Sequence, residues 1–540
     1  ETAAFTYTVP DAWGTCYLNK LGFRQDLDNA SNTEELGRYD NIVVRDADGN
    51  VLYENHFDDP ENPGFDGPSV KVVDGMLRVG VDQVKLANAL EAGAYIDLTD
   101  KVVLDADNRT GTLDWTAPED QDYVIFYLWS QGTAQRSNPA AQPSYCVNYF
   151  DRRGFEAWTE SFSRTVLSDP ELNEKILKGD VQVFMDSLEF NWGSGFTFWS
   201  ENFAKEFEAR KGYDIRPYVI LAKGLSHGPT TFGTNADFVR GTYELTDPVL
   251  GQKIRNDLHD VQTELYMENL LEPMEQWLNQ YNIALRAQIS YGRTPEISEP
   301  TMAVDFPEAE NLNQRNQVDI YRLWTGGAKL ENKILSSETG AVFGMEYAYD
   351  HQRHLQEAYS LYAAGFSRIN WHVWTSSWSP VSVGQSWPGF VSLRICNVLG
   401  QREPGYQEYY ELNQHLGRVQ QLLREGKARA DIGMLYLKYN QEIPFSVSPA
   451  SDDMYMQRHD YMLFPSTELQ EHGYTYDYFS HAFLEDEDVY YNAETGALEQ
   501  AGYRALVLWQ RWLALDGAQS ILKLAKQGLP VVIVDGAAAM

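Results

Sequence analysis

Short runs of apolar residues alternate with polar ones over the first quarter of the chain, a pattern that predicts β-strands. The clearest pair is Asp40–Arg45 and Val51–Asn55, joined by the hairpin dipeptide Asp48-Gly49. Further strands are predicted at Met76–Val79, Tyr95–Leu98, Thr112–Trp115 and Tyr123–Leu128. We therefore predict a β-sandwich-like domain over residues 1–140.

From about residue 141, apolar strands alternate with amphipathic helices. Strands are predicted at Val181–Met185, Ala284–Ile289, Ile334–Ser337 and Arg368–Val373. Helices are predicted near Phe155–Leu167, Phe203–Lys211, Ile254–Gln280, Val318–Asn332 and His354–Ala364, with Gly212 and Gly365 as C-caps. This alternation indicates a parallel sheet, either an α/β barrel or a doubly wound sheet. Polar residues follow the carboxyl ends of the strands, which favours a (β/α)8-type, TIM-like barrel over residues 141–428.

The last part of the chain reads as a third, α/β domain. After a long helix, about Tyr406–Glu425, a new strand begins near Ala430. Strand Ala505–Trp509, a helix over about 519–526 and strand Val531–Val534 form a βαβ unit, which predicts a flavodoxin-like open sheet over residues 429–540. No GxGxxG motif accompanies it, so no nucleotide is expected. The chain starts without Met and stops just after an apolar strand, so we expect it to be truncated.

Composition and charge exclude several classes of partner. With 43 basic and 78 acidic residues the net charge is −35, which excludes a non-specific nucleic-acid binder and disfavours docking on an anionic membrane. No apolar run reaches about 18 residues, so no membrane insertion is expected. Cys16, Cys146 and Cys396 form no CxxC pair; one disulfide and three free thiols both stay open.

Carboxylates at predicted strand ends are the main candidate chemistry. Asp186 and Glu189 follow the strand Val181–Met185, and Glu338 ends the strand that begins at Ile334. A third acidic group, Asp305–Glu310, is predicted to be a loop. Each of these acids could instead cap a turn or face solvent. His351 and His354 share a helical face, but without a third ligand a zinc site is not expected.

Two carboxylates at separate strand ends of one barrel fit glycoside hydrolysis. One would donate a proton to the leaving oxygen, and the other would activate water or attack directly. Aromatic residues make up 13% of the chain, and several follow the same strands, which suits the apolar faces of sugar rings or ordinary packing at the barrel rim. They are Trp192, Tyr291, Trp371, Trp374, Trp378 and Trp387.

Several segments together resemble the α-L-rhamnosidases of glycoside hydrolase family 106. They are Phe207–Tyr218, Ala287–Gly292, Asp305–Glu310, Ser336–Glu338 and Ile369–His372, within a resemblance that covers about residues 112–436. The resemblance implies an inverting exo-glycosidase with Glu189 as general acid and Glu338 as general base. It also implies a calcium ion, for which Glu308 and Glu310 are candidate ligands because calcium prefers hard oxygens. The residues expected to bind substrate are Asp186, Gln288, Tyr291, His372 and Trp374.

The expected activity is release of terminal α-L-rhamnose, or a related deoxy sugar, from a plant or algal polysaccharide or glycoside by a secreted, periplasmic or cell-surface protein. Early barrel strands of the family are not recognisable before residue 140, so the chain is either an internal piece of a longer enzyme or a barrel completed differently. Two alternatives remain open: a non-catalytic carbohydrate-binding protein and a retaining barrel glycosidase. The separation of the two carboxyl groups, about 5–5.5 Å for retention and 6.5–9.5 Å for inversion, distinguishes the mechanisms.

Overall fold

The computed structural model divides the chain into two compact units, residues 1–89 and 90–540. The residues it describes are 37–39, 42–45, 50–56, 70–73, 76–79, 88–105, 110–118, single positions and pairs within 123–137, 144–186, 198–224, 243–290, 295–311, 317–341, 349–374, 399–437 without 402, 463–510 without 465, 512–534 and 537. The predicted boundaries near residues 140 and 428 stay predictions.

The first unit contains antiparallel strands. Strand β1 (Gly37–Tyr39) pairs with β5 (Met76–Val79), which pairs with β4 (Val70–Val73). The predicted hairpin is confirmed as β2 (Ile42–Arg45) and β3 (Val51–Asn55). These strands do not by themselves make two packed sheets, so the β-sandwich stays a prediction.

Short β elements also open the second unit. They are β6 (Asn88–Leu90), which begins in the first unit, β7 (Val102–Asp105), β8 (Thr110–Leu113), β9 (Arg136–Ser137) and β10 (Ser144–Tyr145). Strand β7 pairs with β8, and β9 with β10, both antiparallel. The predicted strand Tyr95–Leu98 is wrong: the segment has no regular structure, and Tyr95 is 53% exposed. An apolar run without a partner strand has no ladder to stabilise it.

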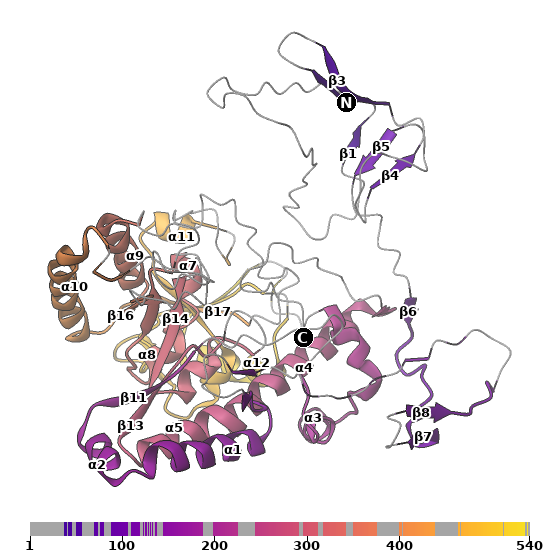
Figure 1. The fold of residues 1–540 in the computed structure, drawn as a ribbon, viewed down its shortest axis with the longest axis horizontal. Helices are drawn as coiled ribbons and strands as arrows, with labels where there is room; N and C mark the ends of the chain where they lie inside the picture. Colours follow the sequence, from indigo (N-terminus) through magenta and orange to yellow (C-terminus); the bar gives the residue numbers. More distant parts are fainter. Residues whose placement is uncertain are drawn as a thin grey trace, which may run out of the picture. The chain divides into compact units, whose positions relative to one another are not determined.

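Five parallel strands form the central sheet of the second unit (Figure 1), in the order β11-β13-β14-β15-β16. They are β11 (Val181–Met185), β13 (Ile283–Ala287), β14 (Phe306–Glu310), β15 (Ser336–Thr339) and β16 (Arg368–Trp371). The order follows the chain, as it does in an α/β barrel, and the sheet is a half-barrel of parallel strands; the complete eight-stranded barrel stays a prediction.

Strand β14 corrects the prediction of a loop at Asp305–Glu310. Residues Phe306 to Glu310 pair with β13 on one side and β15 on the other. Asp305 precedes the strand and accepts a hydrogen bond from the amide of Leu285 (2.7 Å), so it lies at the amino end of the sheet, away from Glu310. Pro and Glu have low strand propensity, but burial between two paired strands overrides that propensity here.

The helices of this unit are α1 (Arg152–Phe162), α2 (Pro170–Lys178), α3 (Phe203–Lys211), α4 (Pro248–Tyr266), α5 (Glu272–Asn279), α7 (Val318–Tyr321), α8 (Thr325–Leu330), α9 (His351–Ala363) and α10 (Tyr409–Arg424). Helix α3 has the predicted bounds, whereas the helix predicted at Ile254–Gln280 begins at Pro248 and the one predicted at Val318–Asn332 is divided into two short helices. A short strand, β12 (Tyr243–Leu245), precedes α4. Asp169 caps α2 and Asp247 caps α4, each before a Pro at the first helical position. Gly212 (φ 78°) and Gly365 (φ 99°) end α3 and α9 in the left-handed conformation, as predicted. In the described residues, no helix is long and apolar enough to cross a bilayer.

A second parallel sheet, in the order β18-β17-β21-β22, lies within the same unit. Its strands are β17 (Ile432–Leu435), β18 (Tyr476–Phe479), β21 (Ala505–Leu508) and β22 (Val531–Ile533), with helices α11 (Glu468–Glu471) and α12 (Leu515–Gln527). A small hairpin, β19 (Tyr491–Asn492) and β20 (Ala497–Leu498), adds to it. The predicted βαβ unit is confirmed as β21, α12 and β22.

One hydrophobic core joins the two parallel sheets. Buried residues of the first sheet, such as Leu285 and Ala309, belong to the same cluster as Met434 and Tyr478 of the second. The two sheets therefore bury their side chains together.

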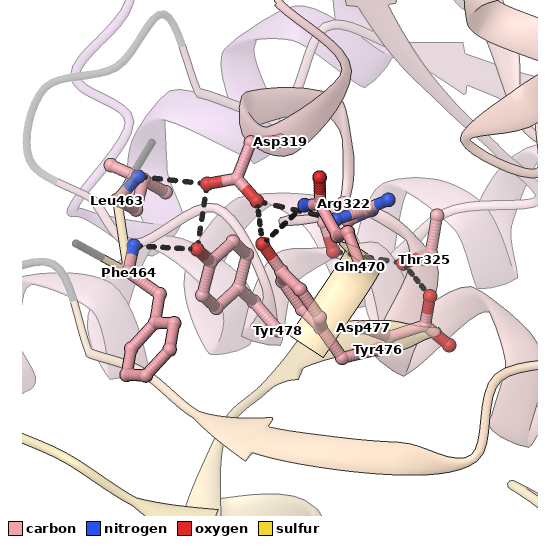
Figure 2. A network of polar contacts seen from close by, with 9 residues as sticks. All are labelled: Asp319, Arg322, Thr325, Leu463, Phe464, Gln470, Tyr476, Asp477 and Tyr478. Atoms are coloured by element: carbon pink, nitrogen blue, oxygen red, sulfur yellow. Dashed lines mark hydrogen bonds and ion pairs between the residues drawn. The ribbon is translucent and has the colours of Figure 1, made fainter. Parts of the chain in front are cut away.

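A buried polar network reinforces this junction (Figure 2). The Asp319 carboxylate at α7 accepts hydrogen bonds from the hydroxyls of Tyr476 and Tyr478 in β18 and from the amide of Leu463 (2.7 Å), with Arg322 at 3.4 Å. Burial beside Asp319 raises the pKa of both tyrosines, so they remain donors. A carboxylate buried at this depth is stabilised by several donors at once.

The close approach of α8 to β18 requires glycine at position 326. A Cβ on Gly326 would lie 2.3 Å from the carbonyl oxygen of Tyr478. We expect Gly326→Ala to lower the free energy of unfolding by about 1–3 kcal/mol, because backbone must move to admit the methyl group. Gly417→Ala in α10 is the control: a Cβ there meets nothing within 4 Å, so helix propensity should make it neutral or slightly stabilising. Urea unfolding of both variants measures this, and equal stabilities would contradict the predicted clash.

Candidate active site

Three polar side chains from neighbouring strands meet at the carboxyl edge of the first sheet. Glu338 is in β15, Gln288 directly follows β13, and His372 directly follows β16. The Gln288 side-chain amide donates to Glu338 Oε2 (2.7 Å), and His372 Nε2 lies 3.5 Å from Glu338 Oε1. Parallel strands place their carboxyl ends at one edge, so residues far apart in sequence converge on Glu338.

The environment of Glu338 favours its neutral form. Burial, and then the negative charges of Asp186 and Glu308, raise the pKa of Glu338 to about 7. Burial also lowers the pKa of His372, so the imidazole is neutral at neutral pH and supplies no counter-charge. A carboxyl group that titrates near pH 7 can exchange protons at neutral pH, as general acid–base chemistry requires.

Asp186 is placed near this carboxylate. It follows β11 at the same edge of the sheet, is solvent-exposed, and its charge acts on Glu338. The strand ends of β11, β13, β15 and β16 thus contribute to one polar site, as the sequence predicted.

A second carboxylate, Glu308, is buried one layer below. Its side chain is fully inaccessible, and Oε2 accepts hydrogen bonds from Ser336 Oγ (2.7 Å) and Asn370 Nδ2 (2.8 Å). Arg286 Nε lies 3.2 Å from the same oxygen, and Arg286 also donates to Asn370 (2.9 Å). Burial raises the pKa of Glu308, and the positive charge of Arg286 opposes this shift.

The other predicted site residues make no described hydrogen bond or ion pair with Glu338. Glu310 ends β14, is buried, and lies opposite Glu338 in the β14–β15 register. Trp374 lies two residues beyond His372 and is 65% exposed. Glu189 and Tyr291 lie outside the described residues, so their predicted roles stay predictions.

Two buried side-chain oxygens, one each from Glu308 and Gln288, are candidate ligands for the predicted calcium ion. Glu308 Oε1 and Gln288 Oε1 are buried and have no hydrogen-bond partner of good geometry among the described residues. Two such oxygens suit a hard cation, although Arg286 already neutralises Glu308. No group of three or more His, Cys, Asp or Glu in the described part of the chain is arranged to hold a metal ion.

His354 is a core residue and not a ligand of the described site. It is fully buried in α9, with its ring against those of Tyr349, Trp371 and Tyr409. Burial lowers its pKa to about 4. Cys146, the cysteine within the described residues, is a free thiol.

Sequence reasoning missed Arg286, Ser336 and Asn370, which surround Glu308. The available signal was a charged or polar residue inside each apolar strand, at a position whose side chain could face the sheet interior. Alternation along the strand would have placed Arg286 on the same face as Gln288.

Comparison with known proteins gives a family match and several structural likenesses. A family model described as α-L-rhamnosidase, glycoside hydrolase family 106, matches residues 67–538. The rhamnosidase from Novosphingobium sp. PP1Y superposes with a TM-score of 0.54 at 16% identity, over 84% of this chain and 40% of that chain. This chain therefore spans less than half of that rhamnosidase.

Two β-galactosidases superpose with lower scores. The family 42 enzyme Gan42B from G. stearothermophilus gives a TM-score of 0.42 at 12% identity, over 74% of this chain and 57% of that chain. The cold-adapted enzyme from Rahnella sp. R3 gives 0.38 at 12% identity, over 68% and 54%. No curated protein matches the chain.

Proposed function

Because the chain belongs to glycoside hydrolase family 106, the α-L-rhamnosidases, we propose that it hydrolyses terminal α-L-rhamnosides, or glycosides of a related deoxy sugar, with inversion of configuration. The expected substrate is a plant or algal polysaccharide or glycoside, and the expected location is secreted, periplasmic or at the cell surface. We also propose that the N-terminal region forms a β-sandwich and that the C-terminal region forms a flavodoxin-like domain.

The observation that carries the proposal is the setting of Glu338. Its carboxyl group is partly buried at the carboxyl edge of the parallel sheet, has a pKa raised to about 7, and accepts a hydrogen bond from the Gln288 amide at 2.7 Å. Active sites of α/β barrels form at this edge. A fixed carboxylate of matched pKa is what activation of a water molecule requires.

In the proposed mechanism Glu338 is the general base. Gln288 occupies one lone pair of Oε2 and fixes the carboxylate plane, so the remaining lone pairs can take a proton from water. The water attacks the anomeric carbon from the face opposite the leaving group, while Glu189 protonates the leaving oxygen. The bond from the anomeric carbon to the leaving oxygen breaks as the new C–O bond forms, which inverts the configuration.

The decisive experiment is a screen of aryl α-glycosides followed by proton NMR of the first sugar released. An α-L-rhamnoside should be cleaved in preference to the other glycosides, and the β anomer of rhamnose should appear first. Release of the α anomer would replace inversion by retention and make Glu338 a nucleophile. Binding of the sugar without hydrolysis would instead favour a non-catalytic carbohydrate-binding protein.

The pH dependence of kcat/KM should separate the two roles open to Glu338. A general base acts when ionised, so activity should rise as the pH increases through about 7, the pKa of Glu338 in the free protein. Asp186→Asn should move this rising limb to lower pH, because the charge of Asp186 helps to raise that pKa. If kcat/KM instead falls as the pH increases through about 7, and this fall shifts in Asp186→Asn, then Glu338 is the proton donor.

A calcium ion is part of the proposed site. Glu310 at the carboxyl end of β14 and Glu308 Oε1 would hold it, with Gln288 Oε1 as a neutral ligand; bound there, calcium would polarise and orient sugar hydroxyls. We expect chelation to abolish activity and Glu310→Gln to weaken calcium binding at least about tenfold, measured by calorimetric titration. Glu308→Gln should also lower stability, because Arg286 would lose its counter-charge. Full activity after exhaustive chelation would remove the metal from the mechanism.

A further inference from the structure

Two short 3₁₀ helices bring crossovers of the two parallel sheets together beside α8. They are η6 (Glu299–Ala303), between β13 and β14, and η11 (His481–Glu485), which follows β18. They meet at Gly327 of α8, where a Cβ would lie 2.8 Å from the ring of Phe483 and 3.0 Å from the carbonyl oxygen of Ser298. The three elements are therefore packed so closely that the junction has no room for a methyl group at this position.

A buried carboxyl group, Glu299, makes a polar contact across this junction. Glu299 is only 8% exposed, and its Oε1 accepts a hydrogen bond from Ser480 Oγ (2.6 Å). The Ser480 oxygen accepts in turn from the amide of Ala482 (3.2 Å) as the N-cap of η11, so its one proton is directed to Glu299. Among the described residues, no Lys, Arg or His forms an ion pair with Glu299. Burial with one hydroxyl donor and no counter-charge disfavours a carboxylate, so this environment fits the neutral acid.

Other acids around Glu299 favour its neutral form further. Helix α4 contributes Asp260 and Glu264, and Glu296 precedes η6 in the same crossover. Burial is the largest cause that raises the pKa of Glu299, which reaches about 8. The three neighbouring negative charges add to this shift, and the hydrogen bond from Ser480 opposes it.

The basic groups of the surrounding elements have other partners. Burial lowers the pKa of His481, so its ring is neutral at neutral pH, while Glu485 of η11 and Asp516 of α12 are further acids near it. In the described part of the chain, no cation is thus placed to neutralise an ionised Glu299. The lysines and arginines of α3 and of α8 and its carboxyl end form these ion pairs: Lys211 with Asp260, Arg210 with Glu264 (3.2 Å) and with Glu268 of η5 (Met267–Leu271; 2.6 Å), Lys329 with Asp477, and Lys333 with Glu331 (2.6 Å).

We propose that Glu299 is a protonation switch in the contact between the two parallel sheets: as a neutral acid it keeps η6 packed on η11, and loss of its proton to solvent at alkaline pH loosens that contact. The ionised carboxylate would be buried beside other acids with one hydroxyl donor, so opening of the junction to water stabilises it. The switch uses no residue of the site around Glu338 and does not depend on the proposed hydrolysis.

The pH window of the switch follows from the pKa of Glu299 in the two states. The pKa is about 8 in the folded protein and has its ordinary value of 4.5 when the chain is unfolded. Between these values the folded state keeps a proton that the unfolded state has released. The contribution of Glu299 to stability is therefore complete below about pH 4.5, decreases about tenfold in folding equilibrium constant per pH unit, and is lost as the pH passes about 8.

Urea unfolding of the full chain between about pH 5 and pH 8 tests this dependence. The variant Glu299→Gln keeps an acceptor for Ser480 but cannot ionise, and all other titrating groups are common to both proteins. We expect the ratio of the wild-type to the variant folding equilibrium constant to fall at least about 10²-fold across this range. Glu160→Gln, on the exposed surface of α1, should follow the wild type at every pH. A ratio that stays constant for Glu299→Gln would overturn the switch.

Two measurements on the native protein test the switch without unfolding it. In infrared difference spectra between wild type and Glu299→Gln, the carbonyl band of a protonated acid should persist at neutral pH and disappear with a midpoint near 8. Ser480→Ala should move that midpoint higher, because the lost hydrogen bond favours the ionised form. Hydrogen exchange of peptides covering residues 298–303 and 480–485 should be equal in wild type and Glu299→Gln at about pH 6, and faster in wild type at about pH 9. Loss of the acid band below about pH 6, or equal exchange at about pH 9, would overturn the proposal.

Discussion

Glu338→Ala should reduce kcat by about 10²–10⁴-fold while sugar binding changes little. The loss follows from removal of the group that takes the proton from water, and its size is that typical of general acid–base catalysis. Binding should persist because the described contacts of Glu338 are to Gln288 and His372, which both remain. Steady-state kinetics with an aryl α-L-rhamnoside and calorimetric titration with rhamnose measure the two effects separately.

Two further variants sharpen this test. Glu160→Ala, on the exposed surface of α1, removes a carboxylate elsewhere and should leave kcat unchanged. Glu189→Gln should spare substrates with good leaving groups, whereas Glu338→Ala should affect good and poor leaving groups alike, because only the acid assists departure. A leaving-group dependence in Glu338→Ala and none in Glu189→Gln would exchange the two roles.

Asp319→Ala should lower the free energy of unfolding by about 3–5 kcal/mol, the largest stability effect that we expect. The substitution leaves two buried tyrosine hydroxyls, the amide of Leu463 and the Arg322 guanidinium without their common acceptor (Figure 2). Removing one member of a buried charged network leaves the other members buried without a partner. This lowers the free energy of unfolding by far more than the intact network contributes to it. Urea unfolding followed by near-ultraviolet circular dichroism measures the effect.

A double-mutant cycle separates this network from general loss of packing. Tyr476→Phe and Tyr478→Phe together should destabilise the wild type, but should cost much less in the Asp319→Ala background, where their hydroxyls already lack an acceptor. Additive effects would show that the tyrosines do not depend on Asp319. The rings remain in every variant, so the cycle leaves their apolar packing in place.

The hydrophobic pattern along the chain, together with cap and turn residues at the ends of helices and strands, predicted most of the described elements. Strand Val181–Met185 and helix Phe203–Lys211 have the predicted bounds, and the βαβ unit at the end of the chain is confirmed. These elements combine an apolar run or face with turn or cap residues at both ends, so local sequence and tertiary burial favour the same structure. The convergence of Gln288, Glu338 and His372 was predictable for a related reason, since strand polarity alone brings their positions to one edge.

Strand β14 and the layer below Glu338 were not predictable in this way. Phe306–Glu310 contains Pro307 and two glutamates, residues that strands disfavour, and its β structure depends on pairing with β13 and β15. Glu308 is tolerated in the interior only because Arg286, Ser336 and Asn370 surround it. Those partners come from three other strands, and no local pattern indicates which buried acid will find a matching base.

The common core of the two parallel sheets also governs when this protein can fold during its synthesis. The core cluster extends along the chain from Phe150 to Val507, a separation of 357 residues. At a translation rate of about 5–20 residues per second, the first of these side chains waits roughly 20–70 s for the last. During that interval the barrel strands expose apolar edges and faces that only the later sheet can cover. Nascent chains of this protein should therefore depend on holding chaperones, and slowing translation before residue 507 should increase aggregation rather than yield.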